Sequence, residues 1–178
     1  MKYIQSILVI IIVLFSAQLF AQGKATKGED YELRMPSSKW VVYSNTDPID
    51  DSRTVIFFLP AEDNTSSAFN RNKFLFVRFK NNAFEVFISW KNYIGRENAT
   101  VITRYDGNPA EEESWSCSLD GDSTFSADHE GTIKKILQSK KLVVRVQGYR
   151  EVITTIFNIH GLKEAARASK YKAGWLSE

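Results

Sequence analysis

The side chains best suited to nucleophilic catalysis are one cysteine and two histidines. Cys117 is the single cysteine of the chain, and His129 and His160 are its two histidines. A thiol beside an imidazole can act as a nucleophile. However, Cys117 lies in a strand-like stretch that predicts a small buried apolar residue. We expect His129 to be exposed in a polar loop and His160 to have a structural role beside Gly161. No Gly-x-Ser-x-Gly motif is present, so the sequence predicts a protein that is not an enzyme.

The residues with the spacing of metal ligands lie between positions 120 and 131. Asp120-Gly121-Asp122-Ser123-Thr124 resembles the start of a calcium loop, in which alternating oxygen ligands surround a hard cation. Such a loop needs Gly at its sixth position and Glu at its twelfth, where this chain has Phe125 and Gly131. The stretch therefore predicts an Asp-Gly turn and no metal site, with Asp120 and Asp122 as the alternative ligands. No Gly-rich phosphate-binding loop is present, and no cofactor is expected.

Five residues in predicted strands are candidates for ligand binding. Each of the three arginines is flanked by apolar residues, so its side chain can point to solvent from the outer face of a sheet. If it shares a face with a tryptophan, the guanidinium and the indole can form a platform for an anion or a carbohydrate. The candidates are Arg78, Arg104, Arg145, Trp90 and Trp115.

The clearest structural pattern lies in residues 74–90, FLFVRFKNNAFEVFISW. Aromatic and β-branched side chains alternate there with a period of two, which is typical of a β-strand. Asn81-Asn82 interrupts the pattern, and asparagine tolerates the backbone conformation of a tight turn. We predict a β-hairpin at the centre of the sheet.

Further strands and two helices complete the predicted fold. Strands are expected over residues 40–43, 53–59, 99–105, 114–118, 123–126, 141–146 and 151–157, and helices over residues 132–139 and 162–171. The run 53–59 is apolar almost throughout and should be buried on both faces. Because no helices regularly separate the strands, the fold class is mainly β: an antiparallel β-sandwich with two short helices, one at the C-terminus.

Composition limits the kind of protein this can be. The chain has 178 residues, of which 43% are hydrophobic, enough for one domain with a proper core. Its formal net charge is +2 without a dense basic run, so no nucleic-acid partner is expected. A single cysteine cannot form an internal disulfide, so the core must stabilise the fold.

The N-terminus has the features of a secretory signal. Lys2 precedes an apolar run over residues 7–15, followed by SAQLFAQG. We place cleavage after Ala21. The third residue before this cut is then Leu19, where signal peptides prefer a small residue. Because nine apolar residues are fewer than the roughly 20 that span a bilayer, cleavage is favoured over a retained anchor. The predicted organisation is a signal peptide (1–21), a flexible lead-in (22–36) and a single domain (37–178), located in the periplasm or outside the cell.

From Trp40 onward, a series of short motifs follows a recognisable order. A Trp, an Asp-rich turn and an apolar strand precede an Arg-containing strand, an Arg-Tyr strand end, an acidic stretch with Trp-Ser, a helix and a final Gly-Trp. These motifs are Trp40, Asp47-Pro48-Ile49-Asp50-Asp51, residues 55–59, Phe76-Val77-Arg78, Thr103-Arg104-Tyr105-Asp106, Glu112-Glu113-Ser114-Trp115-Ser116, residues 133–137, Phe157-Asn158-Ile159-His160-Gly161-Leu162 and Gly174-Trp175. In this order the chain resembles the VasI family of exported proteins associated with type VI secretion. The family pattern carries two cysteines where this chain has Phe79 and Ala173.

The signal and the resemblance predict an exported, non-catalytic accessory or binding protein of the bacterial envelope. Its partner would be an envelope protein or a glycan, with no membrane span after cleavage. Two alternatives remain: a hydrolase of envelope polymers, and a structural surface-interaction domain that associates through an exposed sheet edge. The sequence leaves the ligand and the oligomeric state open.

Overall fold

The computed structural model describes residues 31–34, 39–63, 72–80 and 83–168. The predicted signal peptide (1–21), the Asn81-Asn82 turn and the final Gly174-Trp175 motif lie outside these residues. Within the described part of the chain, no helix is both long and apolar enough to cross a membrane.

Within the described residues, ten strands form one continuous antiparallel sheet in the order β1-β2-β3-β4-β5-β8-β7-β6-β9-β10. They are β1 (Tyr31–Arg34), β2 (Val41–Thr46), β3 (Arg53–Pro60), β4 (Phe74–Lys80), β5 (Ala83–Ser89), β6 (Asn98–Tyr105), β7 (Glu111–Cys117), β8 (Ser123–Phe125), β9 (Lys141–Gln147) and β10 (Val152–Asn158). The predicted hairpin is confirmed, and its strands β4 and β5 occupy the middle of the sheet.

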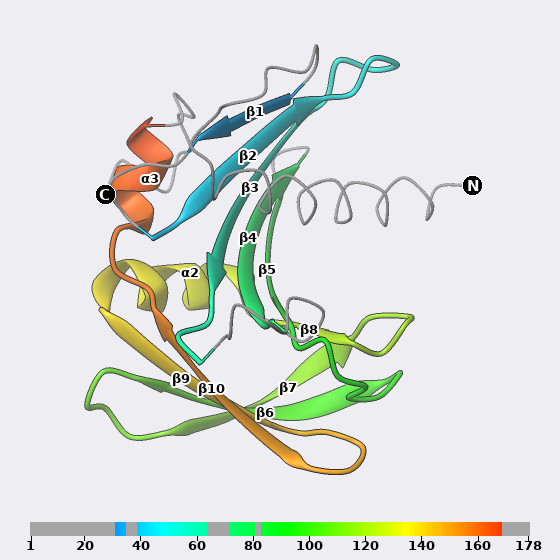
Figure 1. Cartoon of the computed structure of the whole chain (residues 1–178), viewed down its shortest axis with the longest axis vertical. Helices are drawn as coiled ribbons and strands as arrows, with labels where there is room; N and C mark the ends of the chain where they lie inside the picture. The colour runs from blue at the N-terminus through cyan, green and yellow to red at the C-terminus, as the bar shows by residue number, and fades with distance from the viewer. Residues whose placement is uncertain (1–30, 35–38, 64–71, 81–82, 169–178) are drawn as a thin grey trace.

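The sheet has two halves that share one core. Strands β1–β5 form the first half, and β6, β7, β9 and β10 form the second, which crosses below the first in Figure 1. Both contribute to a single apolar cluster that includes Phe57, Leu75, Val101 and Val144. The mainly β antiparallel class is therefore confirmed. The arrangement is consistent with the predicted sandwich, but its two layers are halves of one sheet.

A short seam joins the halves. Strand β8 has three residues and pairs with β5 at three positions and with β7 at two, Ser116 and Cys117. Because so few pairs cross this seam, the sheet can change direction there and still keep one continuous hydrogen-bonded order.

Three tryptophans fill the core between the halves. Trp40, Trp90 and Trp115 are almost completely buried. Each indole N–H donates a hydrogen bond: to the Ile159 carbonyl at 3.0 Å, to Thr124 Oγ1 at 2.9 Å and to Glu113 Oε2 at 2.9 Å, respectively. The rings therefore bury large apolar surface without an unpaired donor.

A second apolar cluster covers the opposite face of the first half. It contains Tyr43, Ile56, Phe58, Phe74, Phe76 and Phe87. Phe76 stacks on Phe87 with ring centroids 4.7 Å apart, and Phe87 stacks on Phe125 at 4.8 Å. These rings lie at paired positions of β4, β5 and β8, so they support the register across three strands. Strand β3 is buried on both faces, as predicted.

Two short helices pack on the sheet, the second of them at the C-terminal end of the described chain (Figure 1). Helix α2 (His129–Gln138) starts after Asp128, whose carboxylate accepts a hydrogen bond from the Gly131 N–H at 2.9 Å. In helix α3 (Leu162–Ala168), the buried Ala165 and Ala166 are small enough to allow close approach to β2 and β3.

Several boundaries differ from the predicted ones: β2 extends to Thr46 and α2 begins at His129, and the differences at β1 and β7 are larger. Tyr31–Arg34, placed in the flexible lead-in, forms β1 beside β2. Strand β7 begins at Glu111, where the three glutamates predict a loop because glutamate disfavours strands. The ammonium of Lys135 on α2 contacts Glu111 at 2.5 Å and Glu113 at 3.4 Å, which offsets their mutual repulsion. The hydrogen bond to Glu111 also raises the pKa of Lys135.

The turn after β3 fastens the first half of the sheet to β10. The Glu62 N–H donates to the Ile156 carbonyl at 2.8 Å. The Asp63 carboxylate accepts from the Thr155 hydroxyl at 2.5 Å and pairs with the Lys73 ammonium at 2.7 Å. Burial raises the pKa of Asp63, but the bonds from Lys73 and Thr155 outweigh this effect, so the net pKa is lowered.

Asp63→Asn should make stability less sensitive to acid. A carboxyl with a lowered folded-state pKa stabilises the fold above its unfolded pKa near 4, and this contribution is lost as the pH falls through the folded value. We expect the variant to lose on the order of 1 kcal/mol at pH 7, because the pair is partly exposed and screened. Its free energy of unfolding should fall less than that of the wild type between about pH 5 and pH 3.

Urea unfolding at several pH values measures this difference. Glu62→Gln is the matched control, because Glu62 makes an exposed ion pair with Lys39 at 3.5 Å, and such pairs contribute little. Equal acid sensitivity of Asp63→Asn and the wild type would contradict the assigned role.

Candidate binding cleft

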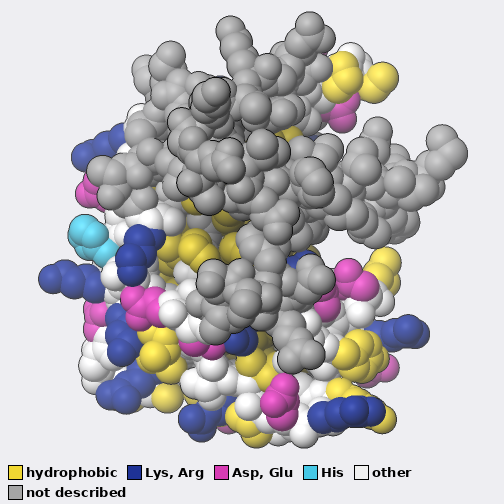
Figure 2. Space-filling model, viewed as in Figure 1, with side chains coloured by type: hydrophobic (Ala, Val, Ile, Leu, Met, Phe, Trp, Pro, Cys, Tyr) yellow, Lys and Arg dark blue, Asp and Glu magenta, His cyan; other side chains and the backbone are white. Residues whose placement is uncertain are grey.

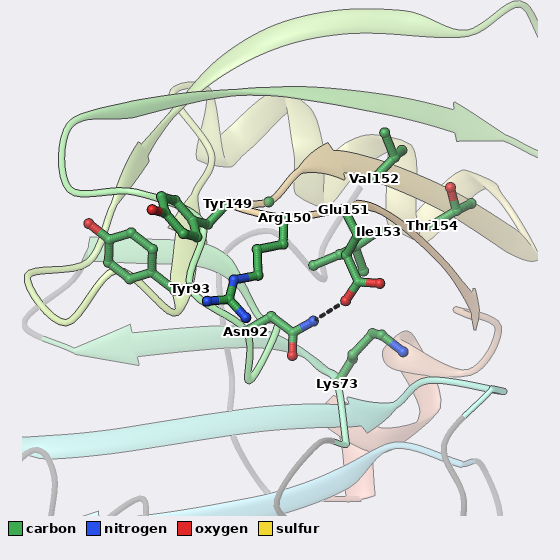
Figure 3. A pocket seen from close by; sticks show the side chains of 10 residues that line it. Lys73, Asn92, Tyr93, Tyr149, Arg150, Glu151, Val152, Ile153 and Thr154 are labelled. Atoms are coloured by element: carbon green, nitrogen blue, oxygen red, sulfur yellow. Dashed lines mark hydrogen bonds between the residues drawn. The ribbon is translucent and has the colours of Figure 1, made fainter.

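A cleft of about 690 Å³ lies beside the turn between β9 and β10 (Figure 3). One wall is formed by Lys73, just before β4, and by Asn92 and Tyr93, which follow β5. The other wall is formed by residues 148–151 of the turn and the first three residues of β10. The cleft therefore lies between segments from both halves of the sheet.

Exposed apolar side chains gather at this cleft. Five large apolar residues are exposed within the described part of the chain, and three of them line it: Tyr93, Tyr149 and Val152. Tyr149 is 75% exposed, and its ring meets that of Tyr93 edge to face, with centroids 6.1 Å apart. Large exposed rings next to a concavity are a feature of binding sites, whereas isolated exposed apolar residues need no such explanation.

Polar groups of both signs face the same space. Figure 3 shows the Asn92 and Glu151 side chains directed toward each other, with Arg150 on one side of them and Lys73 on the other. The Asn92 side-chain amide donates to Glu151 Oε1 at 3.2 Å, and the Arg150 guanidinium carbon lies 6.0 Å from the centre of the Tyr149 ring. The cleft can thus offer aromatic surface, a cation for an acidic group and a carboxylate for a hydrogen-bond donor.

Main-chain hydrogen bonds fix the positions of the two tyrosines. The Gly148 N–H donates to the Glu151 carbonyl at 2.9 Å and closes the turn, and the Tyr149 N–H donates to the Tyr93 carbonyl at 3.1 Å. The second bond joins the β9–β10 turn to the loop after β5. The walls of the cleft are therefore tied to each other.

The predicted Asp-Gly turn supports Tyr93 from behind. Gly121 has a positive φ of 75°, and its carbonyl accepts from the Ile94 N–H at 2.6 Å. A Cβ atom at Gly121 would lie 2.5 Å from both Tyr93 Cε2 and the Gly95 carbonyl oxygen. Only a residue without a side chain leaves room for the ring.

Gly121→Ala should therefore destabilise the fold and displace Tyr93. We expect a loss of about 2–3 kcal/mol, from the left-handed backbone and from the overlap. Gly107→Ala is the control, because a Cβ there would have no neighbour within 4 Å, and it should change stability by less than about 0.5 kcal/mol. Urea unfolding compares the two, and equal stability would contradict this account of the turn.

The two tryptophans considered for ligand binding are core residues. Trp90 is 0% exposed and Trp115 is 1% exposed. The predicted platform of arginine and tryptophan does not form with them, because neither indole presents a ring to solvent. Trp90 directly follows β5 and Trp115 lies in β7, and both side chains point into the core, which the residue types alone do not reveal.

The three arginines lie in strands of both halves of the sheet, and each has a partner of its own. Arg78 forms an ion pair with its cross-strand partner Glu85, and its guanidinium lies 5.4 Å from the centre of the Phe87 ring. Arg104 donates to the Asn108 carbonyl at 2.9 Å, and Arg145 donates to Thr154 Oγ1 at 3.0 Å.

The register of β6 and β9 places Arg104 and Arg145 on the same face, at diagonal positions. Arg78 belongs to the other half of the sheet. On the face shown in Figure 2, basic and acidic side chains are interspersed.

Asp120 and Asp122 accept hydrogen bonds from side chains of the turn in which they lie. Asp120 accepts a hydrogen bond from Ser118 Oγ at 2.5 Å, and Asp122 accepts from Ser123 Oγ at 2.7 Å. Across the described residues, no group of three or more His, Cys, Asp or Glu side chains is placed to hold a metal ion.

The side chains considered for catalysis have structural partners on different elements. Cys117 is half-buried against the core, and burial raises the pKa of its thiol. His129 is not a solvent-exposed loop residue as expected. It begins α2 and is half-buried, and its Nδ1 accepts a hydrogen bond from the Val86 N–H at 3.0 Å. His160 is exposed and lines a smaller cleft of about 410 Å³ with Lys140 and Lys141.

The acidic groups Asp106 and Glu113 likewise have local partners. Asp106 Oδ1 accepts from the Lys140 and Lys141 N–H groups at 3.0 and 2.9 Å, and Glu113 accepts from the Trp115 indole and from Lys135.

Sequence reasoning did not single out Tyr93, Tyr149 or Arg150. The turn around Gly148 was predicted, and it held a signal for the site: Tyr149 follows the glycine in this turn, and turns lie at the protein surface. Tyr93 and Tyr149 are 56 positions apart, and only the pairing of the strands brings them together.

The chain matches no protein-family model, and comparisons with curated proteins and with solved structures give no significant match.

Proposed function

We propose that this protein is an exported, non-catalytic binding module of the bacterial envelope and that the Tyr93–Tyr149 cleft is its recognition surface. The observation that carries the proposal is the exposed tyrosine pair at the edge of a concavity, beside Arg150 and Glu151. The signal-like N-terminus and the resemblance to the VasI family support the location and the accessory role.

Binding explains the cleft better than hydrolysis does. Glycoside hydrolysis typically needs two carboxyl groups on opposite sides of the scissile bond. Among the described residues that line the cleft, Glu151 is the one carboxylate, and it accepts a hydrogen bond from Asn92. The tyrosine rings and the guanidinium are groups that recognise ligands through stacking and ion pairing, without proton transfer.

Site-specific photo-crosslinking tests the recognition surface. A photoreactive phenylalanine analogue at position 149 should crosslink to an envelope protein or glycan when the protein is incubated with an envelope extract. Wild-type protein without the photoreactive analogue should compete for the crosslink. The Tyr93→Ala/Tyr149→Ala double variant should compete about tenfold less well, because central aromatic residues supply much of the binding energy of many interfaces.

Position 49 provides the matched control. Ile49 is 91% exposed in the turn between β2 and β3, outside the cleft. Equal crosslinking from positions 49 and 149, or equal competition by the double variant, would rule out the cleft as the recognition surface.

Export is tested by the mass and location of the protein. We expect the chain to be recovered from the periplasm or the medium without residues 1–21, so that it begins at Gln22. Ile10→Arg interrupts the apolar run and should leave the precursor in the cytoplasm. A full-length wild-type chain in the cytoplasm or the membrane would contradict the proposal.

A further inference from the structure

We propose that the outer edge of β10 accepts an extended segment of a partner polypeptide as an added strand. This inference rests on the proposed binding function of the cleft and names the class of its ligand: a peptide in β conformation.

Among the described strands, the position of β10 in the sheet leaves one of its edges without a neighbour. Strand β10 is last in the sheet order and pairs only with β9 among the described strands. In an antiparallel pair, alternate residues direct both main-chain groups toward the partner or away from it. The Ile156 carbonyl is bonded to the Glu62 N–H, on the side away from β9. Thr154 and Val152, two and four positions earlier, therefore direct their N–H and C=O groups to the same open side.

At one end of this edge, the main chain of β10 is already hydrogen-bonded to another segment of the protein. Glu62 bonds to Ile156, and the Asp63 contact with Thr155 holds that segment in place. For the outward main-chain groups of Val152 and Thr154, the described residues supply no hydrogen-bond partner. Both residues line the cleft (Figure 3). Unpaired groups of this kind are a template for another strand.

The surroundings of the open end fit an extended peptide. Successive side chains of a strand point to opposite faces, so alternate residues of an added segment would meet the same wall. Tyr93 and Tyr149 offer that wall aromatic surface, and Arg150 beside Tyr149 can pair with a carboxylate. We therefore expect a ligand segment with alternating apolar residues and at least one acidic residue.

A second copy of this chain fits the edge less well. The open stretch spans only residues 152–154, because Glu62 already occupies the position beyond it. Two copies paired through that stretch would share fewer residues than the five or six of a typical strand. A peptide can instead continue past the edge and over the tyrosine pair.

A peptide library provides the first test. A phage-displayed library of random twelve-residue peptides is selected on the purified protein as recovered from the cell, and an enriched peptide is synthesised with a fluorescent label. Two further versions carry N-methyl groups on the odd or on the even amides. Because only one set of amides can face β10, one version should bind at least tenfold more weakly and the other within about threefold of the parent. Equal effects of the two versions, or no enriched peptide, would overturn strand addition.

Variants of β10 test the same contact from the side of the protein. Val152→Pro removes an outward N–H and should leave the ladder with β9 intact, since proline is tolerated at the first residue of an edge strand. Val152→Ala keeps the N–H and loses the side chain. We expect Val152→Pro to bind the peptide about fivefold to tenfold more weakly than Val152→Ala, and equal dissociation constants would overturn the proposal.

Hydrogen exchange gives a readout that does not depend on how Val152→Pro folds. The Val152 and Thr154 amides of the wild type should exchange quickly in the free protein and at least tenfold more slowly with the peptide bound. Slow exchange in the free protein would show that the chain itself covers the edge, and unchanged exchange would show that no strand is added. Either result would overturn the inference.

Two outcomes separate this inference from the proposed function. A ligand that needs Tyr149 but tolerates Val152→Pro and both methylated versions would leave the binding cleft in place and remove strand addition. A dimer of the wild type, abolished by Val152→Pro in sedimentation experiments, would replace the peptide with a second copy of the chain.

Discussion

A single antiparallel sheet that bends around its own core holds its two halves together by the packing between them and by a few hydrogen bonds. The chain has one cysteine, so no internal disulfide contributes. Three buried indoles lie in the shared core, and each donates its N–H to a nearby acceptor. Large apolar rings with satisfied donors give the core both volume and a defined geometry. The seam at β8 depends on this packing, because only a few residue pairs cross it.

The cleft follows from the same bend. Its walls are loops of different halves, and their main chains meet where the Tyr149 N–H bonds to the Tyr93 carbonyl. Gly121 leaves space behind Tyr93, and Asp63 holds β10 at the opposite end. Because its walls come from both halves of the sheet, the cleft forms only when the two halves have packed together. The residues that shape it are therefore distributed from position 63 to position 154.

The strands could be predicted where alternating apolar and polar residues reflect packing on one face. The binding cleft could not be predicted. The hairpin over residues 74–90 and the doubly buried β3 follow from period-two patterns and apolar runs. The start of β7 does not, because its glutamates depend on Lys135, which approaches from α2. Residue type suggested Trp90 and Trp115 as binding groups, yet both side chains are buried in the core. In a sheet with apolar residues on both faces, alternation alone does not tell which face meets solvent, and it cannot bring together two turns that are distant in sequence.

The placement of Cys117 gives the molecule an intrinsic reporter. This thiol lies at the end of β7, where β7 pairs with β8, and burial raises its pKa. Its reaction with a maleimide or disulfide reagent should therefore be slow while the strands stay paired and faster whenever they separate. Because no other thiol competes in this chain, a rise in the labelling rate would report the separation of β7 from β8, without any engineered probe.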